Sequence, residues 1–485
     1  EQLPKSETIR LRNKHVGKSC EIFFKNDPLK IIRGAGQYMF DEQGTRYLDC
    51  INNVAHVGHC HPKVVEAGIQ QMKTLATNSR YLHDEMVKLA QNISNTMPEK
   101  LSICYFVNSG SEANDLALRL AKCHTKQQDF ITLDHAYHGS LISVMEVSPY
   151  KFHQSDPLPE HCHIAPCPDT YRGKFTDLTH PSPNTDFGKL YADEVGHIIQ
   201  NIKQKGSGVA GFIAESLQSC GGQIFPPKTY LKNVYQHVRD AGGVNIADEV
   251  QVGFARVGTH YWGFQQYDVV PDIVTIAKPM GNGHPIGAVV TTPEIAESFA
   301  SLGVCYFNTY GGNPVSSAIG NAVMQVIREE NLQEHALKVG KYLIERANVL
   351  KTEYNMVGDV RGSGLFFGID LVTNRQTREP ATKAARAIVN RMKDVHKILV
   401  SCDGPAANVI KLKPPMVFNM ENVDEFIYAM DECLAYLKSQ EQIKSSPIVQ
   451  LTNNLSAGCN LTNGSITEKR DQLIKSVNCL FIFLK

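Results

Sequence analysis

Short apolar runs alternate with helix-like patterns between about residue 100 and residue 330. The runs occupy residues 103–107, 130–133, 209–214, 244–247 and 273–277, and amphipathic stretches separate most of them. Apolar runs of this length between helical patterns are typical of buried strands in a parallel sheet. We therefore predict an α/β fold in which helices cover both faces of a mainly parallel sheet.

Beyond about residue 331 the pattern changes to long helices around a glycine-rich, hairpin-like piece at 362–371. This change predicts a smaller α+β domain that both ends of the chain build. We expect residues 1–75 to contribute to that domain, residues 76–330 to form the large domain, and residues 331–440 to complete the small one. Residues 441–485 are rich in Ser, Asn, Gln and Thr, which predicts a flexible tail.

Four polar residues directly follow apolar runs: Asp134, Glu215, Asp248 and Lys278. Because the carboxyl ends of parallel strands meet at one edge of a sheet, we expect these side chains to converge there. The sequence therefore predicts a functional site at this edge of the sheet.

Lys278 is the most informative of the four. It stands between the apolar run 273–277 and the turn 279–283 (PMGNG). A poorly hydrated lysine favours its neutral, nucleophilic amine, which can form a Schiff base with an aldehyde cofactor. The alternative is a strand-end lysine that reaches back to water, and for a single lysine this alternative is the commoner one.

Asp248 ends the run 244–247 in the segment 243–251 (GVNIADEVQ). An ionised carboxylate at a strand terminus can pair with a protonated pyridine nitrogen, which lets the ring act as an electron sink. The alternative is an N-cap for a following helix. This residue alone leaves both interpretations open.

Two further segments, 106–115 (FVNSGSEAND) and 134–139 (DHAYHG), add to the pattern. Gly110 and Ser111 precede a helical stretch, so that free backbone N–H groups can hold a phosphate there. The alternative is an ordinary capped helix start. Tyr137 can stack on a flat heterocycle or simply pack in the core. Together the lysine, the acid, the phosphate cup and the aromatic residue predict a pyridoxal phosphate site.

In their order and spacing these motifs resemble the class III aminotransferase family, a branch of the fold-type I pyridoxal phosphate enzymes. The resemblance covers about residues 10–440 and includes the segments 47–49 (YLD), 58–62 (GHCHP), 309–314 (TYGGNP) and 359–365 (DVRGSGL). It implies that Lys278 forms the Schiff base and that Asp248 pairs with the pyridine nitrogen.

The resemblance also implies roles for further cofactor-binding residues. Gln251 is expected near the ring hydroxyl, Tyr137 over the ring, and Gly110 and Ser111 at the phosphate. Thr309 is expected to reach the phosphate of the neighbouring subunit. His138 and Glu215 lie in matching segments and are also expected to bind the cofactor. The protein should therefore be a homodimer or homotetramer with shared active sites.

Composition excludes several other classes of protein. The chain has 485 residues, with 49 Lys and Arg against 49 Asp and Glu, so it carries no charge footprint for nucleic acid or an anionic membrane. Its 13 cysteines form no CxxC motif and no zinc-like set with histidine, which predicts no metal and reduced thiols. We expect an intracellular protein of the mitochondrial matrix or the cytosol, with no membrane partner.

The segment near the C-terminus bears on the reaction. In many transaminases of the family an arginine before a Pro-Pro pair grips the substrate carboxylate. Here residues 409–415 read VIKLKPP, so lysines replace the bidentate guanidinium fork. Arg80 in the segment 77–84 (TNSRYLHD) offers another cation, unless that segment is only a solvated loop. We take as candidate substrate-binding residues Asn53, Arg80, Lys411 and Lys413.

The segments 49–62, 78–80, 216–222 and 278–285 are similar to one subgroup of the family. That subgroup holds the ethanolamine-phosphate and 5-phosphohydroxylysine phospho-lyases, also named alanine–glyoxylate aminotransferase 2-like proteins. The likeness implies a lyase that converts phosphoethanolamine into acetaldehyde, ammonia and phosphate, with 5-phosphohydroxylysine as an alternative substrate. Two rival functions stay open: a transaminase of ω-amines or alanine, and a catalytically silent dimeric scaffold. The intact Lys278 and Asp248 argue against the scaffold.

Overall fold

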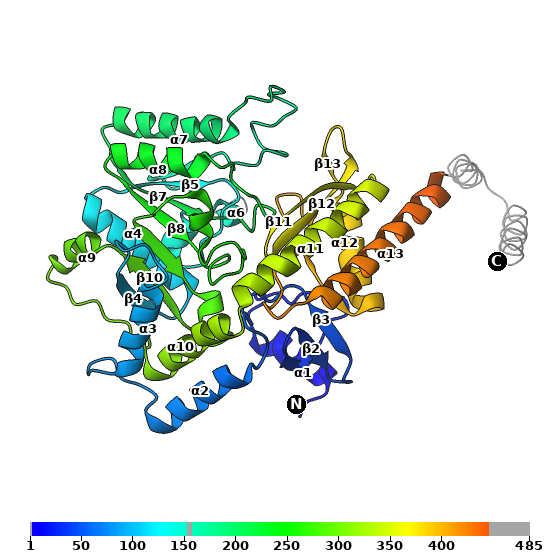
Figure 1. The fold of residues 1–485 in the computed structure, drawn as a ribbon, viewed down its shortest axis with the longest axis horizontal. Helices are drawn as coiled ribbons and strands as arrows, with labels where there is room; N and C mark the ends of the chain where they lie inside the picture. Colours follow the sequence, from blue (N-terminus) through cyan, green and yellow to red (C-terminus); the bar gives the residue numbers. More distant parts are fainter. Residues whose placement is uncertain (1, 153–157, 446–485) are drawn as a thin grey trace, which may run out of the picture. The chain divides into compact units, whose positions relative to one another are not determined.

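The computed structural model describes residues 2–152 and 158–445 (Figure 1). The chain divides into two compact units, Glu1–Cys433 and Leu434–Lys485. Of the second unit the structure describes only the end of helix α13 (Met420–Ser445). The predicted tail, 441–485, lies outside the described residues from residue 446 onward. The domain boundaries given above stay predictions.

A seven-stranded sheet in the order β4-β10-β9-β8-β7-β5-β6 forms the centre of the first unit (Figure 1). Its strands are β4 (Ile103–Val107), β5 (Asp129–Leu133), β6 (Cys162–Ala165), β7 (Val209–Glu215), β8 (Val244–Asp248), β9 (Ile273–Ile276) and β10 (Gly287–Thr291). Only β10 runs antiparallel to its neighbours, so the predicted mainly parallel sheet is confirmed. Every residue of β7, β8, β9 and β10 is buried, and since successive side chains point to opposite faces, both faces are covered.

The helices that pack on this sheet come from the segments between its strands. Helix α4 packs against β9, β10 and the strands beside them, whereas α7 and α8 pack on each other and on β5 to β8. These and the neighbouring helical segments are α4 (Gly110–Thr125), α5 (Ile142–Met145), α6 (Pro149–Phe152), α7 (Phe187–Gln204), α8 (Tyr230–Asp240), α9 (Pro293–Ala300), η1 (Gly263–Tyr267) and η2 (Lys278–Gly281). A separate group packs together from α2 (Pro62–Thr74), α3 (Asp84–Ser94) and α10 (Pro314–Glu329).

Two smaller sheets complete the first unit, and one of them combines strands from both ends of the chain. The first joins the N-terminal strands β1 (Ile31–Ala35), β2 (Tyr38–Asp41) and β3 (Arg46–Asp49) to β14 (Ile398–Leu399), after helix α1 (Lys5–His15). The parallel pair β3–β14 brings Leu48 beside Ile398, which confirms a small α+β domain built from both chain ends. The predicted hairpin at 362–371 lies in the second sheet, where Gly364 has a left-handed φ of 54° in the turn.

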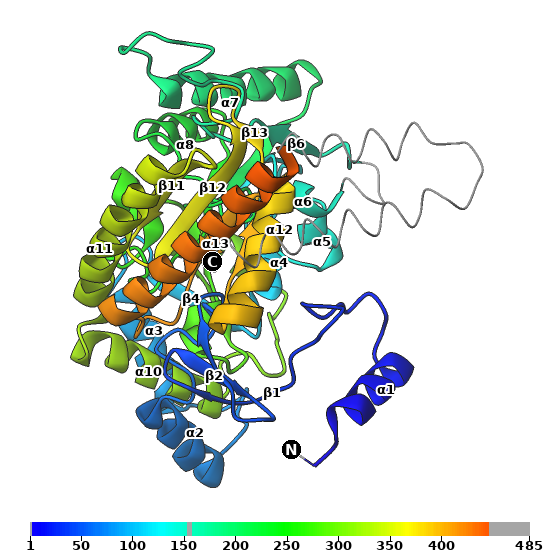
Figure 2. The ribbon, with the colours of Figure 1, turned by 90° about the vertical axis from the view of Figure 1, so that its right-hand side faces the viewer.

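The second small sheet runs in the order β11-β12-β16-β15, with β13 on β12. Its elements are β11 (Val357–Ser363), β12 (Phe366–Asn374), β13 (Glu379–Pro380), β15 (Ser401–Asp403) and β16 (Val409–Leu412). Three helical segments accompany it: α11 (Leu332–Glu353), α12 (Thr382–Arg391) and η3 (Met392–His396). Helix α11 packs on β11, and α12 packs on β12 and β15 (Figure 2).

The strand order explains why the predicted polar residues converge. Strands β5, β7, β8 and β9 are consecutive neighbours and all parallel, so their carboxyl ends share one edge. Glu215 and Asp248 lie opposite each other in register on β7 and β8. Lys278 follows β9 after a single residue.

Two other observations concern the described part of the chain. Its cysteines are all free thiols. None of its helices combines the length and the apolar character needed to cross a membrane. The intracellular location stays a prediction.

Candidate active site

Lys278 begins the 3₁₀ turn η2 directly behind the buried strand β9. Its half-buried side chain lines a cavity of about 370 Å³, a volume usual for a small-molecule site. The turn is fastened by Asn282, whose side chain accepts from Val57 N and donates to Gly58 O, both at 2.9 Å. The predicted nucleophile therefore lies in a cleft rather than on an open surface.

Asp248 lines the same cavity and is 2% exposed. Its Oδ1 accepts from Val250 N at 3.0 Å, and its Oδ2 lies 2.8 Å from both Asn114 Nδ2 and His138 Nδ1. No α-helix starts directly behind β8, where turns run from residue 250 on to η1. The helix-cap interpretation of Asp248 is therefore wrong, and its carboxylate is a held, buried acceptor.

Asn114 is a site residue that the sequence analysis missed. Its Nδ2 donates to Asp248 Oδ2 and to His138 O, and its Oδ1 accepts from Thr275 Oγ1 at 2.7 Å. This side chain connects α4, β8 and β9 around the carboxylate. Its position four residues after Gly110 could have revealed it, because residues four apart share one face of a helix.

The predicted phosphate cup forms the start of α4. Ser109 caps the helix by accepting from Glu112 N at 3.2 Å, and Glu112 in return accepts from Asn108 N at 2.6 Å. Among the described residues, no acceptor meets the N–H groups of Gly110 and Ser111, which line the cavity. The start of α4 is therefore an ordinary capped helix and also offers donors to an anion.

Glycine is required where the cup is crowded. A Cβ at Gly110 would lie 3.0 Å from Val250 Cγ1. Gly139 has a φ of 144°, and a Cβ there would lie 2.5 Å from Ser111 Oγ. Both positions let neighbouring loops close tightly around the cavity.

Tyr137 and His138 come from the loop behind β5. Tyr137 lines the cavity, bonds through its hydroxyl to Ser140 Oγ at 2.8 Å, and meets Tyr150 edge-to-face. The stacking role of its ring stays a prediction. His138 is buried, and its Nε2 has no partner among the described residues.

Gln251 has its orientation fixed by two donors. Asn53 Nδ2 and Lys413 Nζ donate to its Oε1 at 2.9 and 2.8 Å. With the oxygen turned toward these donors, the Nε2 group is available to a ligand in the cavity that Gln251 lines. A ring hydroxyl or its oxyanion would suit this donor.

Glu215 lies behind the cavity lining at 2% exposure. Its Oε2 accepts from Ser219 N at 3.1 Å, and its Oε1 is buried without a partner among the described residues. Burial, and then the negative charge of Asp248, raise the pKa of Glu215 to about 7. Glu215 is thus a supporting acid beside Asp248, and its contact with the cofactor stays a prediction.

Six of the predicted residues do not line this cavity. Glu215 is described above, Asn53 and Lys413 bond to Gln251, and the other three are Lys411, Arg80 and Thr309. Lys411 forms an ion pair with Asp403 on the neighbouring strand. Arg80 is exposed and lies over the Phe307 ring, with its guanidinium carbon 5.6 Å from the ring centroid. Thr309 is also exposed. A role for Thr309 in another subunit's site stays a prediction.

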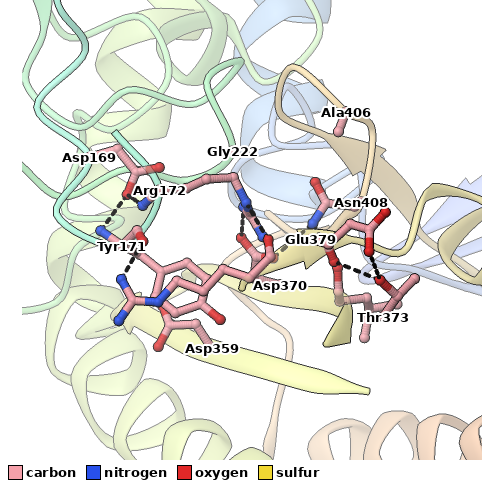
Figure 3. Close-up of polar contacts among 12 residues, drawn as sticks. Asp169, Tyr171, Arg172, Gly222, Asp359, Asp370, Thr373, Glu379, Ala406 and Asn408 are labelled. Carbon is pink, nitrogen blue, oxygen red and sulfur yellow. Dashed lines mark hydrogen bonds and ion pairs between the residues drawn. The ribbon is translucent and has the colours of Figure 1, made fainter. Parts of the chain in front are cut away.

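The loop 216–223 that carries Ser219 is anchored by a buried charge network (Figure 3). Arg361 donates to Gly222 O at 2.7 Å and pairs with Asp370 at 3.2 Å. Asp370 is fully buried and also accepts a bidentate pair from Arg172, with both distances 2.7 Å (Figure 3). The network ties the loop next to the site to the small-domain sheet.

A larger cavity of about 920 Å³ lies between α3, α10 and α11. It shares no lining residue with the cavity at Lys278, and none of the predicted site residues lines it. The described chain also contains no His, Cys, Asp and Glu cluster able to hold a metal ion. The chemistry-bearing residues therefore gather at the smaller cavity.

Residues 24–434 match the family model described as aminotransferase class-III. The chain is 62% identical to a Drosophila melanogaster protein named alanine–glyoxylate aminotransferase 2-like, over 98% of this chain and 97% of that one. It is 46% identical to the Caenorhabditis elegans ethanolamine-phosphate phospho-lyase homolog 1, over 89% and 94%.

Solved structures of similar fold also include a phospholyase and a transaminase. An Arthrobacter phospholyase in complex with phosphoethanolamine superposes with a TM-score of 0.83 at 37% identity, covering 88% of this chain and 99% of that one. An amine transaminase from an uncultivated Pseudomonas species, in its pyridoxal-phosphate-bound form, gives 0.78 at 28% identity, over 87% and 98%.

Pyridoxal phosphate is the cofactor that this fold carries, and the residues present fit it. The free N–H groups of Gly110 and Ser111 suit its phosphate, and the buried carboxylate of Asp248 suits a protonated ring nitrogen. Gln251 offers a donor for the ring hydroxyl. Lys278 is the amine in reach of an aldehyde in the same cavity.

We predict that Lys278→Ala abolishes the visible absorbance of the lysine-bound cofactor together with turnover, because no other lysine lines this cavity. Absorbance spectra of the purified variant measure this directly. Lys232→Ala, at an exposed lysine of α8, serves as the matched control and should keep both properties. A Lys278→Ala protein that keeps the visible band would refute the assignment.

The stability of the protein should depend on pH through Glu215. Its folded pKa of about 7 exceeds the ordinary carboxyl value of 4.5, so the folded state binds a proton that the unfolded state has lost between these values. The free energy of unfolding therefore falls as pH rises through this window, by on the order of 3 kcal/mol. Glu215→Gln cannot ionise, so this variant should not show the part of the pH-dependent fall in unfolding free energy that Glu215 causes.

Denaturant unfolding of the wild type and Glu215→Gln from pH about 4.5 to 8 tests this. Burial also raises the pKa of Glu249 to about 7. Its contribution to the pH dependence is the same in both proteins, so it cancels when the free energy of unfolding of Glu215→Gln is subtracted from that of the wild type. A difference that stays constant over this pH range would contradict the prediction.

Proposed function

Because the chain belongs to the class III aminotransferase family, we propose that it eliminates phosphate from a phosphorylated primary amine. The proposed substrate is phosphoethanolamine, and the products are acetaldehyde, ammonia and phosphate. The chain is a pyridoxal-phosphate-dependent enzyme by family, and the choice of this reaction rests on the observations below.

The ion pair of Lys411 with Asp403 is the observation that carries the proposal. Lys411 lies in the segment 409–415, where many transaminases of the family use an arginine to grip a carboxylate. Burial acts to lower the pKa of Lys411, but the Asp403 carboxylate outweighs it and raises the pKa. The lysine thus stays charged, and its charge is already paired. A substrate without a carboxylate, such as phosphoethanolamine, does not need that contact.

Two relatives support the same choice. The Caenorhabditis elegans relative is named a phospho-lyase homolog, and the Arthrobacter phospholyase is described with phosphoethanolamine bound. A Homo sapiens relative named alanine–glyoxylate aminotransferase 2, 37% identical over 86% of this chain, keeps transamination as the second candidate.

Lys278 would move the proton in the reaction. Pyridoxal phosphate, when bound, supplies an aldehyde that links to an amine and a ring that takes up electron density. The amine of Lys278 removes the proton from the carbon that bears the substrate nitrogen. The carbon–oxygen bond on the next carbon breaks, and phosphate leaves with its electron pair. Water then converts the remaining two-carbon unit into acetaldehyde and ammonia.

Asp248 would keep the ring nitrogen protonated. Its carboxylate is fixed between Asn114 and His138, and its burial leaves little water to compete for the charge. A fixed anion at this place stabilises the positive ring without any rearrangement during the reaction.

We predict that the enzyme releases phosphate from phosphoethanolamine when no keto acid is present. Phosphate, acetaldehyde and ammonia should form in equal molar amounts. A coupled phosphate assay and an aldehyde assay measure these products, with Lys278→Ala as the inactive control. Turnover only in the presence of pyruvate or glyoxylate would identify a transaminase instead. No turnover with either would identify a silent protein, and 5-phosphohydroxylysine in the same panel decides between the two phosphorylated amines.

We also propose that the protein is at least a homodimer. Exposed apolar side chains lie on α2, on the segment after it, on the first turn of α3 and on the segment before α10: Val65, Ile69, Met72, Leu75, Tyr81, Leu82, Val87, Val304, Phe307 and Tyr310. Arg80 lies over Phe307, and Met86 lies against Gly312, so the segments around residues 80–86 and 307–312 are neighbours. Apolar groups of this extent are typical of protein interfaces, and the exposed Thr309 lies among them.

Leu82→Glu should shift the protein toward monomer, because Leu82 is 99% exposed and a charge at an apolar interface opposes association. Light scattering at assay concentration measures the mass. If Thr309 binds the cofactor in the site of the other subunit, the affinity for the cofactor should fall when the dimer dissociates. Leu178→Glu is the matched control at an exposed leucine elsewhere, and it should leave the mass unchanged. An active wild-type monomer would contradict the dimer.

A further inference from the structure

Lys413 is a buried lysine whose surroundings differ from those of Lys411. Only 3% of it is exposed, and its backbone N–H donates to Cys50 O at 2.9 Å. Its Nζ donates to Ser219 Oγ at 2.6 Å and to Gln251 Oε1 at 2.8 Å. Both acceptors are neutral oxygens.

The hydrogen positions around Lys413 are constrained by its partners. Ser219 Oγ donates its own hydrogen to Gln223 Oε1 at 3.0 Å, so it can only accept from the lysine. The amide oxygen of Gln251 has no hydrogen to give. Two N–H groups of Lys413 are therefore used, and these are all that a neutral amine possesses. Its third position holds either a lone pair or an additional proton.

None of the described residues offers a counter-ion for that additional proton. Among the described residues no carboxylate lies within ion-pair distance of Lys413 Nζ, whereas Lys411 has Asp403. An unpaired ammonium in a dry interior costs several kcal/mol, so the neutral amine with a free lone pair is favoured.

We infer that Lys413 receives the phosphate group of the substrate, and that this anion draws a proton from solvent onto the Lys413 amine. The inference rests on the proposed phospho-lyase function for the identity of the anion. One proton is taken up for each anion bound, and no covalent bond is broken in this step.

The location of Lys413 suits this role. Gln251 and Lys278 line one cavity, and Lys413, which does not itself line it, is hydrogen-bonded to Gln251. A lysine has a flexible four-carbon stem, so its ammonium can move from Gln251 toward an anion that enters the cavity. Asn53 remains to hold Gln251 when the lysine moves, because it donates to the same amide oxygen.

Some of the titratable groups around Lys413 lower its pKa and others raise it. Burial lowers the pKa of Lys413 well below its usual value, and the charge of Lys411 lowers it further. The groups that surround it are Lys278, Lys411, Asp403, Cys220 and Glu215. Glu215 titrates near neutral pH, so an anion could also draw a proton onto that residue, and the experiment must separate the two.

Calorimetric titration of the holoenzyme with sulfate tests the inference. Sulfate resembles the phosphate dianion but does not titrate near neutral pH, so any proton taken up comes to the protein. Binding heats in two buffers of different ionisation enthalpy give the number of protons, which we expect to approach about one per site between pH about 7 and 9. Inorganic phosphate serves as the second probe.

Variants assign the proton to its residue. Lys413→Arg carries a permanent charge and should bind sulfate without proton uptake. Lys413→Met should bind sulfate at least about tenfold more weakly, which corresponds to about 1.4 kcal/mol. Glu215→Gln and Lys411→Arg, the second of which keeps the pair with Asp403, should retain the uptake. The cofactor absorbance and the unfolding midpoint of each variant confirm that it is folded.

Uptake that persists in Lys413→Arg or vanishes in Glu215→Gln overturns the inference. So does sulfate binding that is equally tight in Lys413→Met, or absent from the wild type. The phosphate-release assay decides the proposed function separately. If the enzyme releases phosphate but Lys413 takes up no proton, the proposed function stands and this inference is wrong. If anion binding is coupled to proton uptake but no phosphate is released, this inference stands and the proposed function is wrong.

Discussion

The buried carboxylate of Asp248 is the constraint around which the site is organised. A carboxyl group at 2% exposure must have its lone pairs satisfied, and three donors from different segments meet this requirement. Asn114 brings α4, and with it the phosphate cup, to the end of β8. Its bond to Thr275 adds β9, the strand that leads to Lys278. The proposed partners of the cofactor's phosphate, nitrogen and aldehyde are thus positioned relative to one charge.

Charge compensation distinguishes two lysines that stand two residues apart. Lys411 meets Asp403 across the β15–β16 pair and behaves as a structural cation. Lys413 meets only neutral oxygens, so its proton is conditional on what enters the site. Lysine thus forms a permanent ion pair at position 411, whereas at position 413 its charge depends on whether an anion is bound. Local partners decide this, since Lys413 is buried and Lys411 is half-buried.

The small domain is tied to the site by buried polar contacts rather than by apolar packing alone. Arg256 is fully buried and donates to Leu365 O and Pro414 O, while its other nitrogen meets His56 Nδ1 at 3.1 Å. Burial lowers the pKa of this arginine to about 9. Together with the Asp370 network, Arg256 fixes the segment after β16, which begins with Lys413, and the loop 216–223, which carries its partner Ser219. Breaking such buried contacts from one side costs about 3–5 kcal/mol, so their geometry is rigid.

The sequence by itself determined the parallel sheet, the position of Lys278 and Asp248 at strand ends, and the glycines of the phosphate cup. Hydrophobic periodicity and the rule that parallel strands share a carboxyl edge are local or topological properties, and they can be read along the chain. The N-cap alternative at Asp248 could not be excluded in this way, because local spacing does not say whether turns or a helix follow. Only the tertiary structure decided the partners of the charged residues. Asn114, Asp403 and Gln251 lie 134, 8 and 162 residues from the side chains they hold at Asp248, Lys411 and Lys413. Which buried charge is paired and which is left open depends on distances through space, and the order of residues does not contain them.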